Sequence, residues 1–138
     1  MQHVLFLCTH NSARSQMAQG LLNWLASDRY IAFSAGTHPT QINPFAVAVM
    51  GELGIDINGQ GVHQTTDYYN QPFDLVVTVC DDAAEECPIF PGARQQLHWS
   101  FADPSAFIGD DAAKLAAFRE TRDRILARLR AWLAGNAG

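Results

Sequence analysis

Cys8 and Arg14, a cysteine and an arginine with five residues between them, mark the stretch of this sequence that is best suited to a reactive site. Backbone N–H groups of a tight loop converge on one point, and a following helix adds its positive N-terminal end. The guanidinium of Arg14 can bind two oxygens at once. Such a loop is suited to a tetrahedral oxyanion. The residues expected to bind it are Thr9, His10, Asn11, Ser12, Ala13, Arg14 and Ser15.

The same loop suits a nucleophilic thiolate at Cys8. Donors that attract an oxyanion also stabilise the charged form of the sulfur, which is its reactive form. Ser15 can donate a further hydrogen bond to this sulfur. Taken alone, the pair of residues could equally be a structural thiol and a surface arginine. The apolar run before the loop and the amphipathic pattern after it favour a catalytic loop.

Two more cysteines, Cys80 and Cys87, follow a second apolar run, 73–79. Neighbouring strands lie about 4.8 Å apart, so if the two runs pair, Cys8 and Cys80 emerge at the same edge of the sheet. The alternatives are a small core residue at Cys80 and an incidental thiol at Cys87. Seven residues of helix span ~10.5 Å, whereas a disulfide needs Cα atoms within ~4.4–6.8 Å. We therefore predict that the intervening segment changes conformation on oxidation.

Asp103, which precedes Pro104, is a candidate general acid. A carboxylic acid beside the anion loop could protonate the leaving oxygen of a bound oxyanion. An Asp-Pro pair is also a common turn starter or helix cap, and this structural role is the alternative.

The hydrophobic pattern predicts the elements that position these residues. Continuous apolar runs are typical of strands buried on both faces of a parallel sheet, and they alternate here with apolar residues at helical spacing. We expect one α/β domain over 1–138, a four-stranded parallel sheet with helices on both faces, and ligands at the carboxyl ends of the strands. The predicted strands are 3–7, 30–35, 73–79 and 95–99, and the predicted helices are 15–28, 44–53, 65–70 and 110–133. Gly36 is expected to end the second strand, and Asn43 is the expected N-terminal cap of the second helix.

Composition excludes several classes of function. The net charge of −5 over 138 residues argues against a nucleic-acid binder. No signal peptide and no apolar run of about 20 residues is evident, so we expect a cytoplasmic protein without a membrane partner. Three cysteines in a reducing compartment argue against a permanent disulfide set, and transient, catalytic disulfides are the exception that such a compartment allows. Nothing in the sequence indicates an obligate interface, and we expect a monomer.

The sequence resembles the thioredoxin-coupled arsenate reductases, which are relatives of the low-molecular-weight protein tyrosine phosphatases. The resemblance implies their Rossmann-like, three-layer α/β fold. Cys80 and Cys87 are the discriminating residues, because a phosphatase needs neither and usually carries a tyrosine where this chain has Ser105. The matching stretches are Leu7-Cys8-Thr9, Asn11-Ser12, Arg14 to Ala18, Ser34-Ala35-Gly36, Gly54 to Ile57, Asp74 to Thr78, Cys80, Cys87-Pro88, His98-Trp99 and Asp103-Pro104.

The resemblance also implies a mechanism. Cys8 attacks arsenate held by the loop and Arg14, and Asp103 assists departure of an oxygen as water. Cys80 then attacks Cys8 and releases arsenite, and Cys87 moves the disulfide to a pair that thioredoxin reduces. Electrons come from thiols, so no cofactor is expected.

Three positions depart from the family pattern. Ala13 stands where many relatives have a cysteine that the three-thiol relay does not need. His10 stands where relatives often have glycine, and its side chain could crowd or tune the anion site. Some relatives bind a monovalent cation through a carboxylate in the first helix, where this chain has Gln19. We therefore expect no metal.

Two other functions compete with arsenate reduction. A phosphatase would hydrolyse a phosphomonoester with Cys8, Arg14 and Asp103 alone. A non-catalytic oxyanion-binding or redox-sensing module would use the thiols only to report oxidation. Replacing Cys87 separates the first two functions, because only the reductase needs it.

Overall fold

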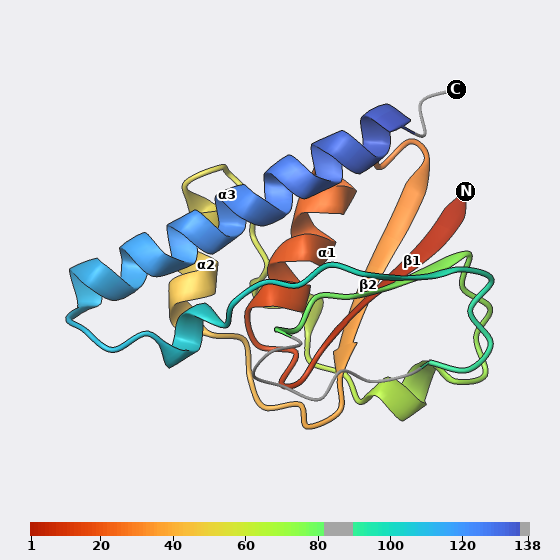
Figure 1. Cartoon of the computed structure of the whole chain (residues 1–138), viewed down its shortest axis with the longest axis horizontal. Coiled ribbons are helices and arrows are strands. Elements are labelled where there is room, and N and C mark those ends of the chain that lie inside the picture. The colour runs from red at the N-terminus through yellow and green to blue at the C-terminus, as the bar shows by residue number, and fades with distance from the viewer. Residues whose placement is uncertain (82–89, 136–138) are drawn as a thin grey trace.

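A four-stranded parallel sheet forms the centre of the molecule, and its strand order is β2-β1-β3-β4 (Figure 1). The computed structural model describes residues 1–81 and 90–135. β1 has a neighbour on both sides, which explains why its residues from Val4 to Cys8 are buried and almost all strongly apolar. The predicted strands are confirmed, although β3 is shorter than the apolar run 73–79. The strands are β1 (Gln2–Cys8), β2 (Tyr30–Gly36), β3 (Leu75–Thr78) and β4 (Gln96–His98).

Helices connect the strands as the hydrophobic pattern predicts. Asn43 caps the second helix, and its side-chain oxygen accepts a hydrogen bond from the N–H of Phe45 at 2.8 Å. Asp103 begins a short 3-10 helix where a loop was expected. The helices are α1 (Arg14–Leu25), α2 (Pro44–Gly51), α3 (Asp111–Gly135), η1 (Asn58–Gln60), η2 (Thr65–Tyr68) and η3 (Pro104–Ala106).

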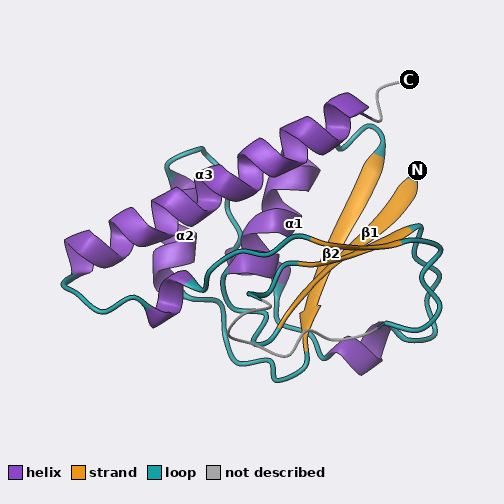
Figure 2. Cartoon of the chain, in the orientation of Figure 1, coloured by secondary structure: helices purple, strands orange, loops and turns teal. Residues whose placement is uncertain are grey.

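The two faces of the sheet carry different layers. Val4 and Phe6 of β1 point to the core that α1, α2 and α3 share, and Figure 1 shows α3 crossing over the other two helices. Leu5 and Leu7 point to the opposite face, where they meet an aromatic group that includes Tyr68. Figure 2 shows η2 on that side, across the sheet from the three α-helices. The α/β architecture is confirmed, with all three α-helices of the described residues on one face.

The described part of the chain contains no helix that is both long enough and apolar enough to cross a bilayer.

Candidate active site

The loop that follows β1 is held in place by its carbonyl oxygens. Four of them accept backbone hydrogen bonds, and that of Asn11 accepts one from the Gln16 side chain at 3.0 Å. A peptide unit is planar and trans, so its N–H points away from its C=O. The N–H groups of these units therefore point inward, away from the segments that hold the carbonyls. The backbone pairs are His38 to Thr9 (2.8 Å), Thr40 to His10 (3.1 Å), Asn43 to Ser12 (2.9 Å) and Met17 to Ala13 (2.8 Å), donor first.

Close packing against the end of β2 fixes the position of the loop. Gly36 pairs with Cys8 in the parallel register. A Cβ atom at Gly36 would lie 2.6 Å from the Thr9 carbonyl oxygen and 2.7 Å from the Asn11 nitrogen, so only glycine fits. Asn11 itself has a φ of 51°, a left-handed conformation that asparagine adopts more readily than most residues.

A buried hydrogen-bond network runs beneath the loop and ends at Cys8, the predicted nucleophile. The amide nitrogen of Asn11 donates to the hydroxyls of Ser15 and Ser34, both at 2.9 Å, and Ser34 donates to Gln19 at 2.6 Å. Ser15 Oγ lies 2.8 Å from the Cys8 sulfur. Since Asn11 donates to Ser15, the Ser15 proton is free to point at the sulfur. If Cys8 reacts as a thiolate, which can only accept, this proton is in position to be donated to it.

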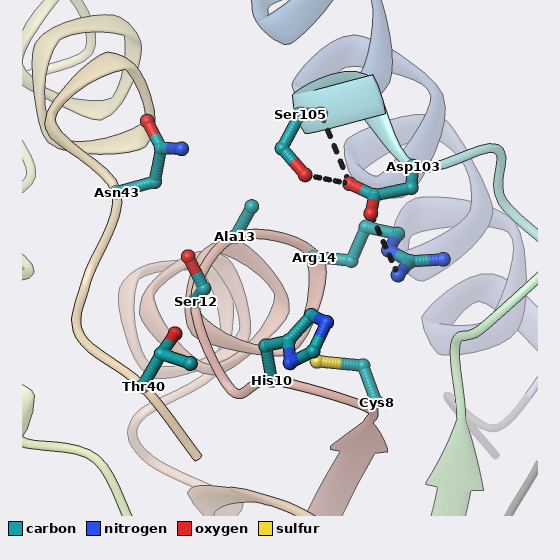
Figure 3. Close-up of a pocket in the computed structure, with 9 residues that line it drawn as sticks. All are labelled: Cys8, His10, Ser12, Ala13, Arg14, Thr40, Asn43, Asp103 and Ser105. Atoms are coloured by element: carbon teal, nitrogen blue, oxygen red, sulfur yellow. Dashed lines mark hydrogen bonds and ion pairs between the residues drawn. The ribbon is translucent and has the colours of Figure 1, made fainter. Parts of the chain in front are cut away.

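A pocket of about 190 Å³ opens above Cys8 (Figure 3). Its volume suits a small tetrahedral anion and its walls come from three separate parts of the chain. Arg14 and Asp103 lie on one side of the pocket in Figure 3, and Thr40 and Asn43 lie on the other. The lining residues are Cys8, His10, Ser12, Ala13, Arg14, Thr40, Asn43, Asp103 and Ser105.

Arg14 and Asp103 form an ion pair at the wall of the pocket. The guanidinium is 3% exposed; Nη2 lies 3.6 Å from Asp103 Oδ2 and Nη1 donates to the Phe101 carbonyl at 3.0 Å. Asp103 Oδ1 accepts from the Ser105 N–H at 2.9 Å and from its hydroxyl at 2.6 Å. The helix-cap alternative for Asp103 is confirmed, because one carboxylate oxygen caps η3. The other oxygen faces Arg14 at the pocket, and the role of general acid stays a prediction.

The second cysteine, Cys80, lies just after the end of β3, the strand that pairs with β1. β1 and β3 pair with Leu7 opposite Thr78, and the Val79 N–H donates to the Leu7 carbonyl at 2.9 Å. Val79 therefore lies beside Cys8, and Cys80 follows it at the same edge of the sheet. Cys80 is fully buried and disulfide-bonded, whereas Cys8 is a free thiol. Cys87 and the predicted change in the segment before it lie outside the described residues.

The structure divides the predicted anion-binding residues into two groups. Four of them line the pocket, namely His10, Ser12, Ala13 and Arg14. The other three, Thr9, Asn11 and Ser15, make hydrogen bonds that hold the loop and Cys8 in position. Sequence reasoning missed Thr40, Asn43 and Ser105 as pocket residues. Asn43 was predicted only as a helix cap, and no local pattern indicates that this cap also faces an anion loop.

Comparison with known proteins agrees with this geometry. Residues 3–136 match the low molecular weight phosphotyrosine protein phosphatase family. An arsenate reductase of Halalkalibacterium halodurans is 42% identical over 127 residues, which cover 92% of this chain and 91% of the relative. A solved arsenate reductase in the phosphate binding state superimposes with a TM-score of 0.78 at 28% identity, covering 98% of both chains. A thioredoxin-dependent arsenate reductase of Corynebacterium glutamicum gives a TM-score of 0.66 at 29% identity, covering 95% of this chain and 61% of that one.

A free cysteine in a loop whose carbonyl oxygens are held from outside, at the carboxyl edge of a parallel sheet, is the arrangement expected of a phosphatase-like α/β domain. The chain belongs to the low molecular weight phosphotyrosine protein phosphatase family and, within it, to the arsenate reductases. The resemblance that the sequence motifs indicated is thereby confirmed.

Proposed function

We propose that this protein reduces arsenate to arsenite through a relay of three cysteines that thioredoxin regenerates. One observation carries the proposal. The free thiol of Cys8 lies at the base of the pocket, while Cys80, just after the end of the neighbouring strand, is disulfide-bonded. This is the state in which such a relay ends, with the nucleophile restored and the oxidising equivalents passed on.

The first step joins arsenate to the enzyme. Loop N–H groups and Arg14 hold the oxygens, and the Cys8 thiolate attacks arsenic. One oxygen leaves as water after taking a proton from Asp103. Asp103 Oδ1 is engaged by Ser105, so Oδ2, the oxygen that faces Arg14, is the one that carries the proton. Arsenic is still pentavalent in the resulting Cys8 adduct.

The next steps move two electrons. The Cys80 thiolate attacks the Cys8 sulfur, the sulfur–arsenic bond breaks, and arsenic keeps the electron pair and leaves as arsenite. Cys8 and Cys80 are now a disulfide. Cys87 attacks Cys80 in turn, which releases the Cys8 thiolate and leaves a disulfide between Cys80 and Cys87. The dithiol of thioredoxin reduces that disulfide and closes the cycle.

Thiols supply both electrons, so the proposed reaction needs no flavin, nicotinamide or metal. The Corynebacterium glutamicum neighbour, which is thioredoxin-dependent, supports thioredoxin as the reductant. Hydrolysis of a phosphomonoester is less well supported than arsenate reduction. Cys80 and Cys87 would have no role in it, and the relatives named above are arsenate reductases.

The test follows arsenite release from the purified protein with arsenate, thioredoxin, thioredoxin reductase and its reductant. The wild type is expected to turn over many times. Cys87→Ser is expected to release one arsenite per protein and to stop with Cys8 and Cys80 joined, which mass spectrometry of the peptides detects. Cys8→Ser is the matched control and is expected to release none. Sustained turnover of Cys87→Ser, or no arsenite from the wild type, would contradict the proposal.

A further inference from the structure

We propose that His10 is a substrate-binding residue of this pocket and that its protonated ring supplies the second positive charge for the oxyanion. The inference rests on the proposed function for the identity of the substrate, and it adds a residue and a pH dependence to that site. Its evidence is the position of the ring, the hydrogen bond that orients it and the balance of charge around it.

The ring of His10 is held in one orientation at the mouth of the pocket. Nδ1 lies 3.1 Å from the His38 carbonyl oxygen, which can only accept a hydrogen bond, so Nδ1 carries a proton. Nε2 is then the nitrogen that gains or loses the second proton. The His10 backbone is fixed as well, because its carbonyl accepts from Thr40 N–H. Figure 3 shows the ring beside the pocket that Cys8 and Arg14 line.

The charges of the residues that line the pocket indicate a role for a protonated His10. Arg14 is the one permanent cation among the nine lining residues, and Asp103 lies 3.6 Å from it. The Cys8 thiolate adds a negative charge when the nucleophile is ready to react. With Asp103 protonated, as the proposed acid step requires, the charges of these three groups sum to zero before the anion arrives. His10 is the other lining residue that can become a cation, and its protonation brings the sum to +1, which favours an anion.

The exposure of His10 allows it to exchange its proton with water while it faces the pocket. The titratable or charged groups around it are Cys8, Arg14 and Asp103 in the pocket and the ring of His38 beside it. The His38 ring is exposed, and its Nδ1 lies 3.2 Å from the Thr37 hydroxyl. Histidine is the side chain that ordinarily changes charge between pH 5 and 8. Anion affinity should therefore fall as the pH rises through that range.

The test measures binding of inorganic phosphate by titration calorimetry at pH 6 and at pH 8. His10→Gln keeps a polar side chain but cannot become a cation, and His10→Lys keeps the charge at both pH values. Phosphate itself changes charge over this range in every protein, so the readout is the ratio of the variant Kd to the wild-type Kd. His3→Gln is the matched control, because His3 lies at the amino end of β1, at the opposite edge of the sheet.

We expect the His10→Gln ratio to be about fivefold at pH 6, which is typical of a partly exposed charge pair, and under twofold at pH 8. His10→Lys is expected to match the wild type at pH 6 and to bind more tightly than it at pH 8. The His3→Gln ratio should stay near one. A His10→Gln ratio that is equal at both pH values would overturn the inference, because it would assign His10 only to holding the loop.

The two proposals can fail separately. Phosphate binding involves no electron transfer, so the pH-dependent ratio can be found in a protein that releases no arsenite. A protein that reduces arsenate but shows a constant ratio would retain the proposed function and lose the role of His10. In the reductase assay, the expected effect of His10→Gln is a raised KM for arsenate at pH 6 with kcat nearly unchanged.

Discussion

Ser15 Oγ and the Cys8 sulfur lie 2.8 Å apart, and a third residue anchors the hydroxyl. Asn11 donates an N–H to Ser15 Oγ, which leaves the hydroxyl proton available for a Cys8 thiolate, a group that can only accept. Asn11 is positioned in turn by the His63 N–H, which donates to its side-chain oxygen at 2.9 Å. Buried side chains therefore position one hydrogen-bond donor, the Ser15 hydroxyl, beside Cys8 before any substrate binds.

Replacing Ser15 with alanine should make Cys8 less reactive at neutral pH. The variant loses a hydrogen bond that stabilises the thiolate, and a bond of this kind corresponds to about a three- to tenfold change in rate. The measurement is the rate of iodoacetamide alkylation of Cys8, followed by mass spectrometry of the peptide that contains it. Ser27→Ala, an exposed serine in the turn after α1, is the control and should alkylate at the wild-type rate. Equal rates for all three proteins would remove Ser15 from the mechanism.

Replacing Gly36 with alanine should displace the anion loop, because Gly36 packs against the loop backbone. The new Cβ would lie within 2.7 Å of two backbone atoms of the loop, which must move, at a cost of about 1–3 kcal/mol in stability. We expect weaker phosphate binding and slower arsenite release in a protein whose circular dichroism is unchanged. Gly51→Ala is the matched control, because no atom lies within 4 Å of a Cβ at that position. Phosphate affinity equal to the wild type in Gly36→Ala would show that the loop accommodates the methyl group.

Replacing Asp103 with asparagine should separate its two roles. Asparagine still caps η3 but cannot donate a carboxylic proton, so kcat should fall by about 10²–10⁴-fold while the melting temperature changes little. Asp110→Asn is the control, because Asp110 also caps a helix, accepting from Ala113 N–H at 2.8 Å, and does not line the pocket. A large loss of stability with unchanged kcat would assign Asp103 to the cap alone.

Glu52 should contribute stability that disappears in acid. Hydrogen bonds from Arg119 and Arg122 lower its pKa from 4.5 to about 2. Since the folded pKa lies below the unfolded one, the contribution is fully present above about pH 4.5 and is lost as the pH falls towards 2. The urea midpoint of Glu52→Gln should therefore lie below that of the wild type at pH 7 and converge with it near pH 2.

A single ion pair within α3 provides the control for this prediction. Glu120 meets Arg124 at 2.8 Å, and both side chains are exposed. Glu120→Gln should shift the urea midpoint less than Glu52→Gln at pH 7, because Glu120 has one exposed partner, whereas Glu52 also pairs with the buried Arg122. A Glu52→Gln deficit that persists unchanged at pH 2 would show that its effect does not come from ionisation.

The fold could be predicted largely because its strands are buried. A central parallel strand such as β1 must be apolar on both faces, and this leaves a continuous run that is visible in the sequence. The Asn43 cap was visible for a similar reason, since it satisfies backbone donors only two residues away. The uneven layering of the sheet was not visible, because the pattern of one helix does not say which face of a distant sheet it covers.

The candidate site could be predicted only where its residues are close together in the sequence. Cys8 and Arg14 share one loop, so their spacing carried the information. Thr40 and Ser105 reach the pocket from segments about 30 and 90 residues further on, and no local pattern marks them. Gly36 was interpreted as the end of a strand, although its more specific role, close contact with the loop, depends on a register that only the structure gives.

The hydrogen bonds to the carbonyl oxygens of the anion loop determine how much of the chain must accompany the loop if it is grafted onto another protein. Residues 8–15 grafted onto another sheet would carry the nucleophile and the arginine but not the groups that turn the peptide units inward. The β2–α2 connection holds three of those carbonyls, and His63 holds Asn11. The groups that hold the loop backbone therefore lie in one continuous piece of chain, 2–64, whereas Phe101 and Asp103, which contact Arg14, lie outside it. A graft would need both parts of the chain.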